Sequence, residues 1–251
     1  MKKLYTTIAV VLTLAGISMG SQLLASSRNP QPPAPALVMP ELVRGQLLLS
    51  NKDLDDADII AMAPHFPEGM KDLILDNNNI GSAGAIAVAK NLNRAPGLKL
   101  ISLSGNHIGV DGARTIVQHL PASLRKLHLS ENRFGDAEAE ALAEHPLPKN
   151  LEMLDLEDNH IGNAGAKALA KHPFPKSLLA LNLIKNNIGD EGIIAIAENL
   201  KLNPPASLTV GIKNNKFGAR GKQALRDADY IELPEDEWLR DDRTPRAGHD
   251  H

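Results

Sequence analysis

The chain has 251 residues, a formal net charge of −3, no cysteine and 3% aromatic residues. The lack of cysteine excludes thiol nucleophiles, disulfides, cysteine-linked lipid anchors and cysteine-ligated metals. The balance of 27 Lys and Arg against 30 Asp and Glu, together with the few aromatic rings, argues against nucleic-acid binding. A hydrophobic content of 43% is enough for one domain with a buried core.

The N-terminus has the features of an export signal. Two lysines at positions 2 and 3 precede an uncharged stretch whose most apolar part, Ile8 to Ile17, has the length of a signal-peptide core. Ser18 and Gly20 then place small side chains at a cleavage site, which predicts a signal peptide over residues 1–20. The alternative is an uncleaved anchor that extends to residue 25, long enough for a layer of about 30 Å. Both interpretations imply export. A cleaved chain would be periplasmic or secreted, and an anchored chain would face outward from an inner membrane.

Residues 21–41 contain five prolines. Proline lacks a backbone N–H and fixes its φ angle, so this segment cannot sustain a helix or a sheet ladder. The segment is therefore predicted to be an extended linker, and folding is expected to start at residue 42.

From residue 42 onward one short unit recurs. A typical copy reads Leu154-Asp-Leu-Glu-Asp-Asn159-His-Ile-Gly162, and each copy lies 26 to 29 residues from the next. Lys52 takes the place of Asn in the first, atypical copy. The other six copies share an asparagine in register: Asn78, Asn106, Asn132, Asn159, Asn186 and Asn215.

Each unit predicts a strand, a turn and a helix. The Leu-x-Leu alternation indicates a strand with one apolar face, and an Ala-rich stretch after the glycine indicates a helix. In five units the residue one place past the glycine position is predicted to be the helix N-cap. These residues are Asp56, Ser82, Asp136, Asn163 and Asp190. Prolines return the chain to the next strand, and units this short must stack to bury their apolar faces.

The consensus Leu-x-x-Leu-x-Leu-x-x-Asn-x-Ile-Gly-x-x-Gly-Ala-x-x-Leu-Ala resembles the leucine-rich repeat of the ribonuclease-inhibitor type. We expect the chain to be bacterial and exported. The resemblance covers residues 42–233 and implies a curved α/β solenoid of about seven units, with a parallel sheet on the concave face and helices on the convex face. Glu138 departs from it, because five of the other six units carry a second glycine there: Gly84, Gly112, Gly165, Gly192 and Gly221. Tyr230 to Leu233 are expected to form a closing cap strand, and residues 234–251 a disordered charged tail.

Two polar ladders follow from the register. The six asparagines are expected to be structural, because an amide can satisfy backbone groups left unpaired at the turn. A second ladder lies at the predicted helix ends and contains both histidine and asparagine. Either residue can serve the exposed carbonyls of a helix end, so this mixture favours capping over a metal site. Its members are His65, Asn91, His119, His145, His172 and Asn199.

The exposed face of the sheet carries the candidate binding residues. Equivalent positions on adjacent parallel strands lie about 4.8 Å apart, so the middle of this face is predicted to be acidic and its C-terminal flank basic. A solvated face is the alternative. The residues assigned to binding are Ser102, His128, Ser130, Glu131, Asp155, Glu157, Asp158, Asn182 and Lys185.

These observations predict a monomeric, non-enzymatic scaffold that needs no cofactor or metal and that docks a protein or peptide with a basic patch. Because the resemblance extends to regulators of small GTPases, such a role in a host cell is an alternative. A cation-binding protein and a hydrolase that uses Asp155 and Glu157 are further alternatives. We expect the open sheet to lack the buried pocket that would raise a carboxyl pKa for such a reaction.

Overall fold

The chain divides into two units, Met1–Glu41 and Leu42–His251. The computed structural model describes residues 41–205 and 207–228, which fall almost entirely in the second unit. The predicted signal peptide, the linker up to residue 40, the cap strand and the tail lie outside the described residues.

Each repeat contributes a three-residue strand and then a helix, as the Leu-x-Leu and Ala-rich segments predict. Short 3-10 turns η1 (Ala63–His65) and η2 (Leu92–Arg94) follow the first two helices. The strands are β1 (Gln46–Leu48), β2 (Asp72–Ile74), β3 (Leu100–Ser102), β4 (Lys126–His128), β5 (Met153–Asp155), β6 (Ala180–Asn182) and β7 (Thr209–Gly211). The helices are α1 (Asp56–Met62), α2 (Ser82–Asn91), α3 (Val110–His119), α4 (Asp136–Leu142), α5 (Asn163–Leu169), α6 (Asp190–Leu202) and α7 (Ala219–Asp227).

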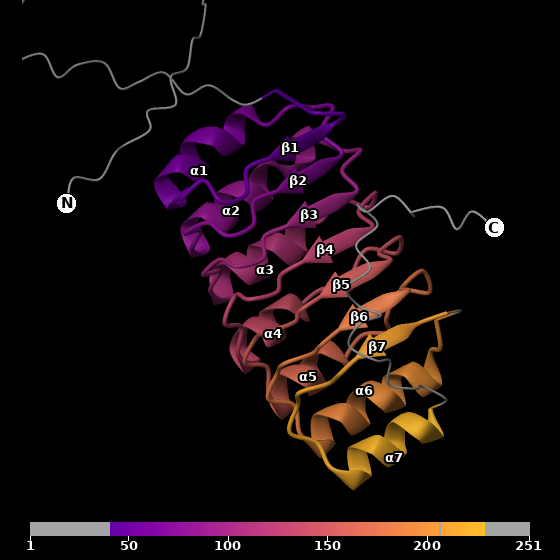
Figure 1. Cartoon of the computed structure of the whole chain (residues 1–251). Coiled ribbons are helices and arrows are strands. Elements are labelled where there is room, and N and C mark those ends of the chain that lie inside the picture. The colour runs from indigo at the N-terminus through magenta and orange to yellow at the C-terminus, as the bar shows by residue number, and fades with distance from the viewer. Residues whose placement is uncertain (1–40, 206, 229–251) are drawn as a thin grey trace, which may run out of the picture. The chain divides into compact units, whose positions relative to one another are not determined.

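The strands form one parallel sheet in the order of the chain, from β1 to β7. Equivalent residues of the repeats pair directly, for example Leu127 with Leu154 and Leu154 with Leu181. Figure 1 shows the helices stacked along one side of this sheet, with all strands running in the same direction. The predicted curved α/β solenoid is confirmed.

The core lies between the sheet and the helices. Both leucines of the repeat triplet are buried, as Leu154 and Leu156 illustrate, because alternate strand residues face the same side. Successive helices pack closely through small residues. A Cβ added at Gly165 would lie 2.8 Å from the Cβ of Ala139 in the preceding helix. The second glycine of the repeat is therefore needed for this close approach.

The repeat asparagines join neighbouring repeats through their buried amides. The Oδ1 of Asn159 accepts hydrogen bonds from the backbone N–H groups of Asn132 (3.0 Å) and Phe134 (2.8 Å) in the preceding repeat. Its Nδ2 donates to the carbonyls of Leu129 and Leu156. The same pattern recurs from Asn78 to Asn215, so each amide pairs the backbone groups that the turn leaves without a strand or helix partner.

The residues predicted as N-caps do not cap the helix of their own repeat, so that prediction is wrong. Each of them instead caps the helix of the following repeat. The N-cap positions of α2 and α4 to α6 are glycines, and Asp55 rather than Asp56 caps α1. The Oδ1 of Asp56 instead accepts from the N–H groups of Gly81 (2.7 Å) and Gly84 (2.8 Å), at the start of α2. Stacking of the repeats brings each of these side chains to the N-terminus of the helix in the following repeat. The residue pattern within one repeat does not reveal this contact. Ser82, Asp136, Asn163 and Asp190 act in the same way toward α3, α5, α6 and α7.

This scheme explains why Glu138 departs from the repeat consensus. The residue of α3 that should cap α4 is Val110, which has no side-chain oxygen. Glu138 supplies one from within α4, because its Oε2 accepts from the N–H of Gly135 at 2.9 Å. The helix is therefore capped internally at the one junction where the preceding repeat cannot do so.

Candidate protein-binding face of the sheet

The residues predicted to bind a partner lie at and just beyond the carboxyl ends of β3 to β6. His128, Asp155 and Asn182 occupy equivalent positions on three adjacent strands. Ser102 and Asn182 were expected on the exposed face, but their exposures are only 4% and 5%. Each is hydrogen-bonded to a carboxylate of the preceding repeat, Ser102 to Asp76 and Asn182 to Glu157. These two residues help to shape the face and offer little surface of their own.

Ser102 reveals a residue that the sequence reasoning missed. Its hydroxyl donates to Oδ1 of Asp76 in the preceding repeat, which also accepts from the backbone N–H of Ser104 at 3.0 Å. Ser130 extends the network, since its hydroxyl donates to that of Ser104 at 2.8 Å. Asp76 stands at the same repeat position as Glu157, so the alignment held the signal that could have identified it.

The exposed charges are Glu131 and Asp158, with Lys185 beside them. Glu131 and Glu157 lie side by side, because the N–H of Glu131 donates to the carbonyl of Glu157 at 2.9 Å. The Nζ of Lys185 lies 2.9 Å from Oε1 of Glu157 and 3.8 Å from Oδ2 of Asp158. These carboxylates raise the pKa of Lys185, mainly through the hydrogen bond to Glu157. We call Glu131, Asp155, Glu157 and Asp158 the acidic patch.

Asp155 is the least solvated member of the acidic patch. Burial raises its pKa to about 6, and the nearby Glu157 and Glu131 carboxylates act in the same direction. The backbone N–H of Glu157, which donates to Oδ1 at 3.0 Å, and the side chain of Asn182 oppose the shift. The expectation that no carboxyl pKa is raised on this face is therefore wrong, because the packed strand ends exclude water without a deep pocket.

The turn that carries these charges has a left-handed backbone in every repeat. Residues before the asparagine ladder have φ between 51° and 65°: Asn51, Asn77, Gly105, Glu131, Asp158, Lys185 and Asn214. Asparagine and glycine tolerate this region, whereas a residue such as Glu131 or Lys185 costs roughly 1 kcal/mol there. At Gly105 a Cβ would also lie 2.2 Å from Oδ1 of Asn77. Long charged side chains are thus held at positions where the backbone disfavours them.

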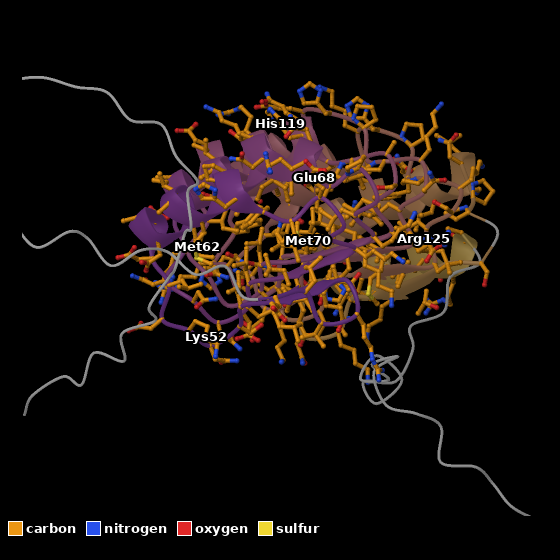
Figure 2. All side chains as sticks on the ribbon, turned by 90° about the horizontal axis from the view of Figure 1, so that it is seen from above. Lys52, Met62, Glu68, Met70, His119 and Arg125 are labelled. Atoms are coloured by element: carbon orange, nitrogen blue, oxygen red, sulfur yellow. The ribbon has the colours of Figure 1, made fainter. Side chains whose placement is uncertain are left out.

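The histidine and asparagine ladder lies on the other side of the domain. In Figure 2, His119 of this ladder and Lys52, at the turn after β1, lie on opposite sides. Asn91 and Asn199 donate to helix-end carbonyls, the latter to Ala170 at 2.6 Å and His172 at 2.9 Å in the preceding repeat. Within residues 41–205 and 207–228, no three His, Asp or Glu side chains are grouped to hold a metal ion.

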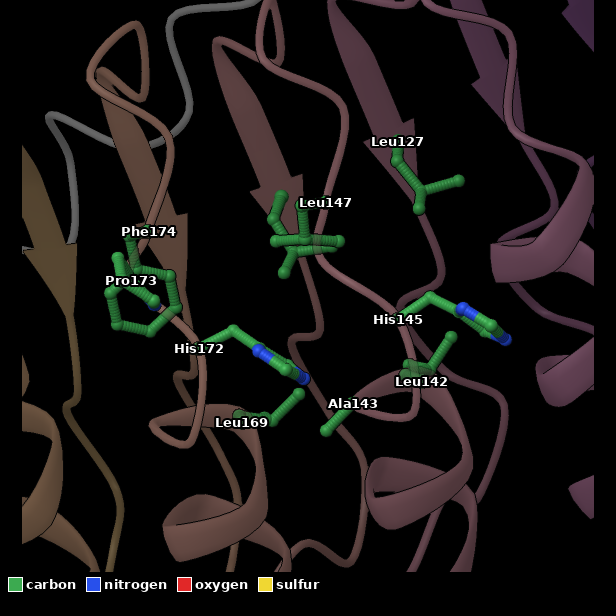
Figure 3. A pocket seen from close by; sticks show the side chains of 10 residues that line it. Leu127, Leu142, Ala143, His145, Leu147, Leu169, His172, Pro173 and Phe174 are labelled. Atoms are coloured by element: carbon green, nitrogen blue, oxygen red, sulfur yellow. The ribbon is translucent and has the colours of Figure 1, made fainter.

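A small apolar cavity opens beside this ladder, between repeats four and five. Figure 3 shows His145 and His172 at its margin, with Leu142, Leu147 and Phe174 among its lining residues. Its volume of about 20 Å³ is enough for one water molecule and too small for an organic ligand. The cavity therefore adds no binding site to the sheet face.

Comparisons with known proteins agree with this architecture. The Leucine Rich repeat family matches residues 70–89, 98–117, 121–143, 148–170 and 175–197. Tonsoku-like proteins of Mus musculus and Bos taurus are 37% and 34% identical over 79 residues, which is 30% of this chain and 6% of theirs. The chain thus matches only a small part of these curated relatives.

Two solved structures resemble the chain at 16% identity. One is leiomodin-1 actin-binding site 2, with a TM-score of 0.43, covering 68% of this chain and 85% of that one. The other is an internalin from Listeria monocytogenes, with a TM-score of 0.41, covering 71% and 51%. No helix in the described part of the chain is long and apolar enough to cross a membrane. The repeat register, the seven-stranded parallel sheet and the family matches together identify the chain as a leucine-rich-repeat protein.

Proposed function

We propose that the carboxyl ends of β4 to β6 dock a protein or peptide with a basic patch, and that the protein performs no chemistry of its own. Leucine-rich-repeat proteins commonly act as protein-binding scaffolds, and this domain offers a rigid parallel sheet. The observation that carries the proposal is the exposure of Glu131 and Asp158 on adjacent repeats. Glu131 projects from a left-handed turn that asparagine or glycine would form at lower cost.

The charges of the acidic patch favour electrostatic steering of a cationic partner. Asp158 has a side-chain exposure of 52%, and Glu157 retains 29%. Lys185 neutralises only part of the patch, since a single ammonium faces several carboxylates. A partner with a basic surface would therefore associate faster at low salt, because the field of the acidic patch is screened within about 10 Å at 0.1 M salt.

The test compares two double charge reversals in the full-length protein. Glu131→Lys with Asp158→Lys reverses the exposed charges of the acidic patch. Glu140→Lys with Glu198→Lys makes the same change in net charge on the exposed helical side and serves as the control. We expect the parent and the control to capture the same proteins from an envelope extract, and the Glu131→Lys, Asp158→Lys variant to fail to capture them. Association of the captured partner with the parent should also slow as salt rises.

Loss of capture with the control alone would place the docking surface on the helices. Capture that is retained by both variants would contradict electrostatic docking on the acidic patch. Equal melting temperatures for the three proteins ensure that the comparison reports binding, since all four substituted side chains are exposed.

We also propose that the protein is exported and processed near Ser21. Support comes from the two N-terminal lysines, the apolar stretch Ile8 to Ile17 and the small residues Ser18 and Gly20. The intact mass of the exported protein should correspond to a chain that lacks residues 1–20. A full-length chain retained in the membrane fraction would contradict cleavage and support the uncleaved anchor.

A further inference from the structure

The edge of the sheet where the strands begin carries a row of stacked cations. Backbone hydrogen bonds place the residues just before successive strands side by side. The N–H of Lys99 donates to the carbonyl of Lys71 at 2.6 Å, and the N–H of Arg125 donates to that of Lys99 at 2.8 Å. We call Lys71, Lys99 and Arg125 the basic row. All three are exposed, and Figure 2 labels Arg125.

The basic row is poorly neutralised by the rest of the domain. Arg125 forms an ion pair with Glu152 of the next repeat. Lys71 and Lys99 form no ion pair with any residue in the described ranges 41–205 and 207–228. Their spacing of about 4.8 Å between adjacent strands makes the like charges repel each other. An anionic chain lying along this edge would remove that repulsion.

The chain supplies a segment of the required charge and reach. Glu235-Asp236-Glu237 is a run of three carboxylates that follows α7. Helices end on the side where strands begin (Figure 1), so the chain leaves α7 at Ala228 on the edge that bears the basic row. Lys176, just before β6, illustrates this proximity, because its Nζ donates to the carbonyl of Pro204 after α6 at 3.0 Å.

The distances are compatible with contact. Lys99 is four strands away from β7, or about 19 Å along the edge, and the helix layer lies about 10 Å from the sheet. From Ala228 to the three carboxylates the chain advances seven to nine residues, which span about 23 to 30 Å when extended. A row one residue wide also matches a single extended peptide better than a flat membrane surface.

We propose that Glu235–Glu237 binds the basic row in the full-length protein. The segment neutralises Lys71 and Lys99 and leaves the acidic patch as the free charged surface of the domain. The proposed path of the chain after α7 differs from the one that the expected cap strand, Tyr230 to Leu233, would require. A strand added in parallel beside β7 would carry the tail to the opposite edge, near Lys213 and Lys216.

Cysteine pairs test this arrangement, since the natural chain has no cysteine. Asp236→Cys is combined in the full-length protein with Lys99→Cys, with Lys201→Cys at the end of α6, or with Lys216→Cys at the opposite edge. A tail without a preferred site should reach position 201 most easily, because it lies nearest to α7. Docking on the basic row should instead make the disulfide at position 99 form about tenfold faster than at either control position.

Charge dependence completes the test. High salt should remove the faster disulfide formation at position 99, and so should reversing the tail charges with Glu235→Lys and Glu237→Lys. Adding Lys71→Glu and Arg125→Glu to the charge-reversed tail should restore the faster formation, because the two charges are then exchanged. Faster linking at position 201 or 216 would overturn the proposal, as would an advantage at position 99 that survives both perturbations. Covalent dimers in place of intramolecular links would also overturn it, since they would assign the basic row to a second copy.

Discussion

Replacement of Asn159 by alanine should uncouple the fourth and fifth repeats. The amide accepts from the N–H groups of Asn132 and Phe134 and donates to buried carbonyls on both sides of the repeat junction. Alanine leaves these N–H groups without a partner in a site where Asn159 is 2% exposed. Each unsatisfied buried group costs about 1–3 kcal/mol, and partial relaxation reduces the sum, so we expect a loss of about 3 kcal/mol.

Urea titration monitored by circular dichroism measures this loss, and Asn187→Ala is the matched control. The side chain of Asn187 is partly exposed and forms no hydrogen bond within the described residues, so its removal should change the free energy of unfolding by less than about 0.5 kcal/mol. Hydrogen exchange should accelerate at the amides of Asn132 and Phe134 only in Asn159→Ala. Equal urea midpoints for the two variants, or unchanged exchange at those amides, would refute the structural role of the ladder.

Three further substitutions follow from the caps, the turn and the buried carboxyl. Glu138→Ala should lower the free energy of unfolding by about 1 kcal/mol, and adding Val110→Asp should restore most of it by capping α4 from the preceding repeat. A double variant no more stable in urea than the single would contradict this scheme. Glu131→Gly should raise stability by roughly 1 kcal/mol, since glycine adopts positive φ without strain, and a lower melting temperature would argue against strain. The pKa of Asp155 is raised from 3.8 to about 6, so the folded state loses stability as the pH rises through that window. Asp155→Asn should therefore match the parent near pH 4 and exceed it by up to about 3 kcal/mol near pH 7.5, and a constant difference between the two pH values would contradict burial of this charge.

The sequence alone was sufficient to predict the repeat architecture. Residues such as Leu154 and Leu156 alternate with a period that only a strand satisfies, and Asn159 recurs in register with its equivalents. Units this short cannot bury their leucines alone, so stacking into a parallel sheet was the remaining solution. The positions of the acidic patch residues on adjacent strands followed from the same register.

Only the tertiary structure decided how much of each side chain remains available and which neighbour it contacts. Ser102 and Asn182 are buried and hydrogen-bonded to carboxylates of the preceding repeats, and Asp155 has a raised pKa because packing removes water from its carboxyl. The oxygen of Asp56 caps the following helix, not its own. Sequence periodicity fixes which residues are equivalent, but exposure, capping partners and pKa depend on atoms about 25 residues away in the chain. Those atoms come into contact only when the repeats stack.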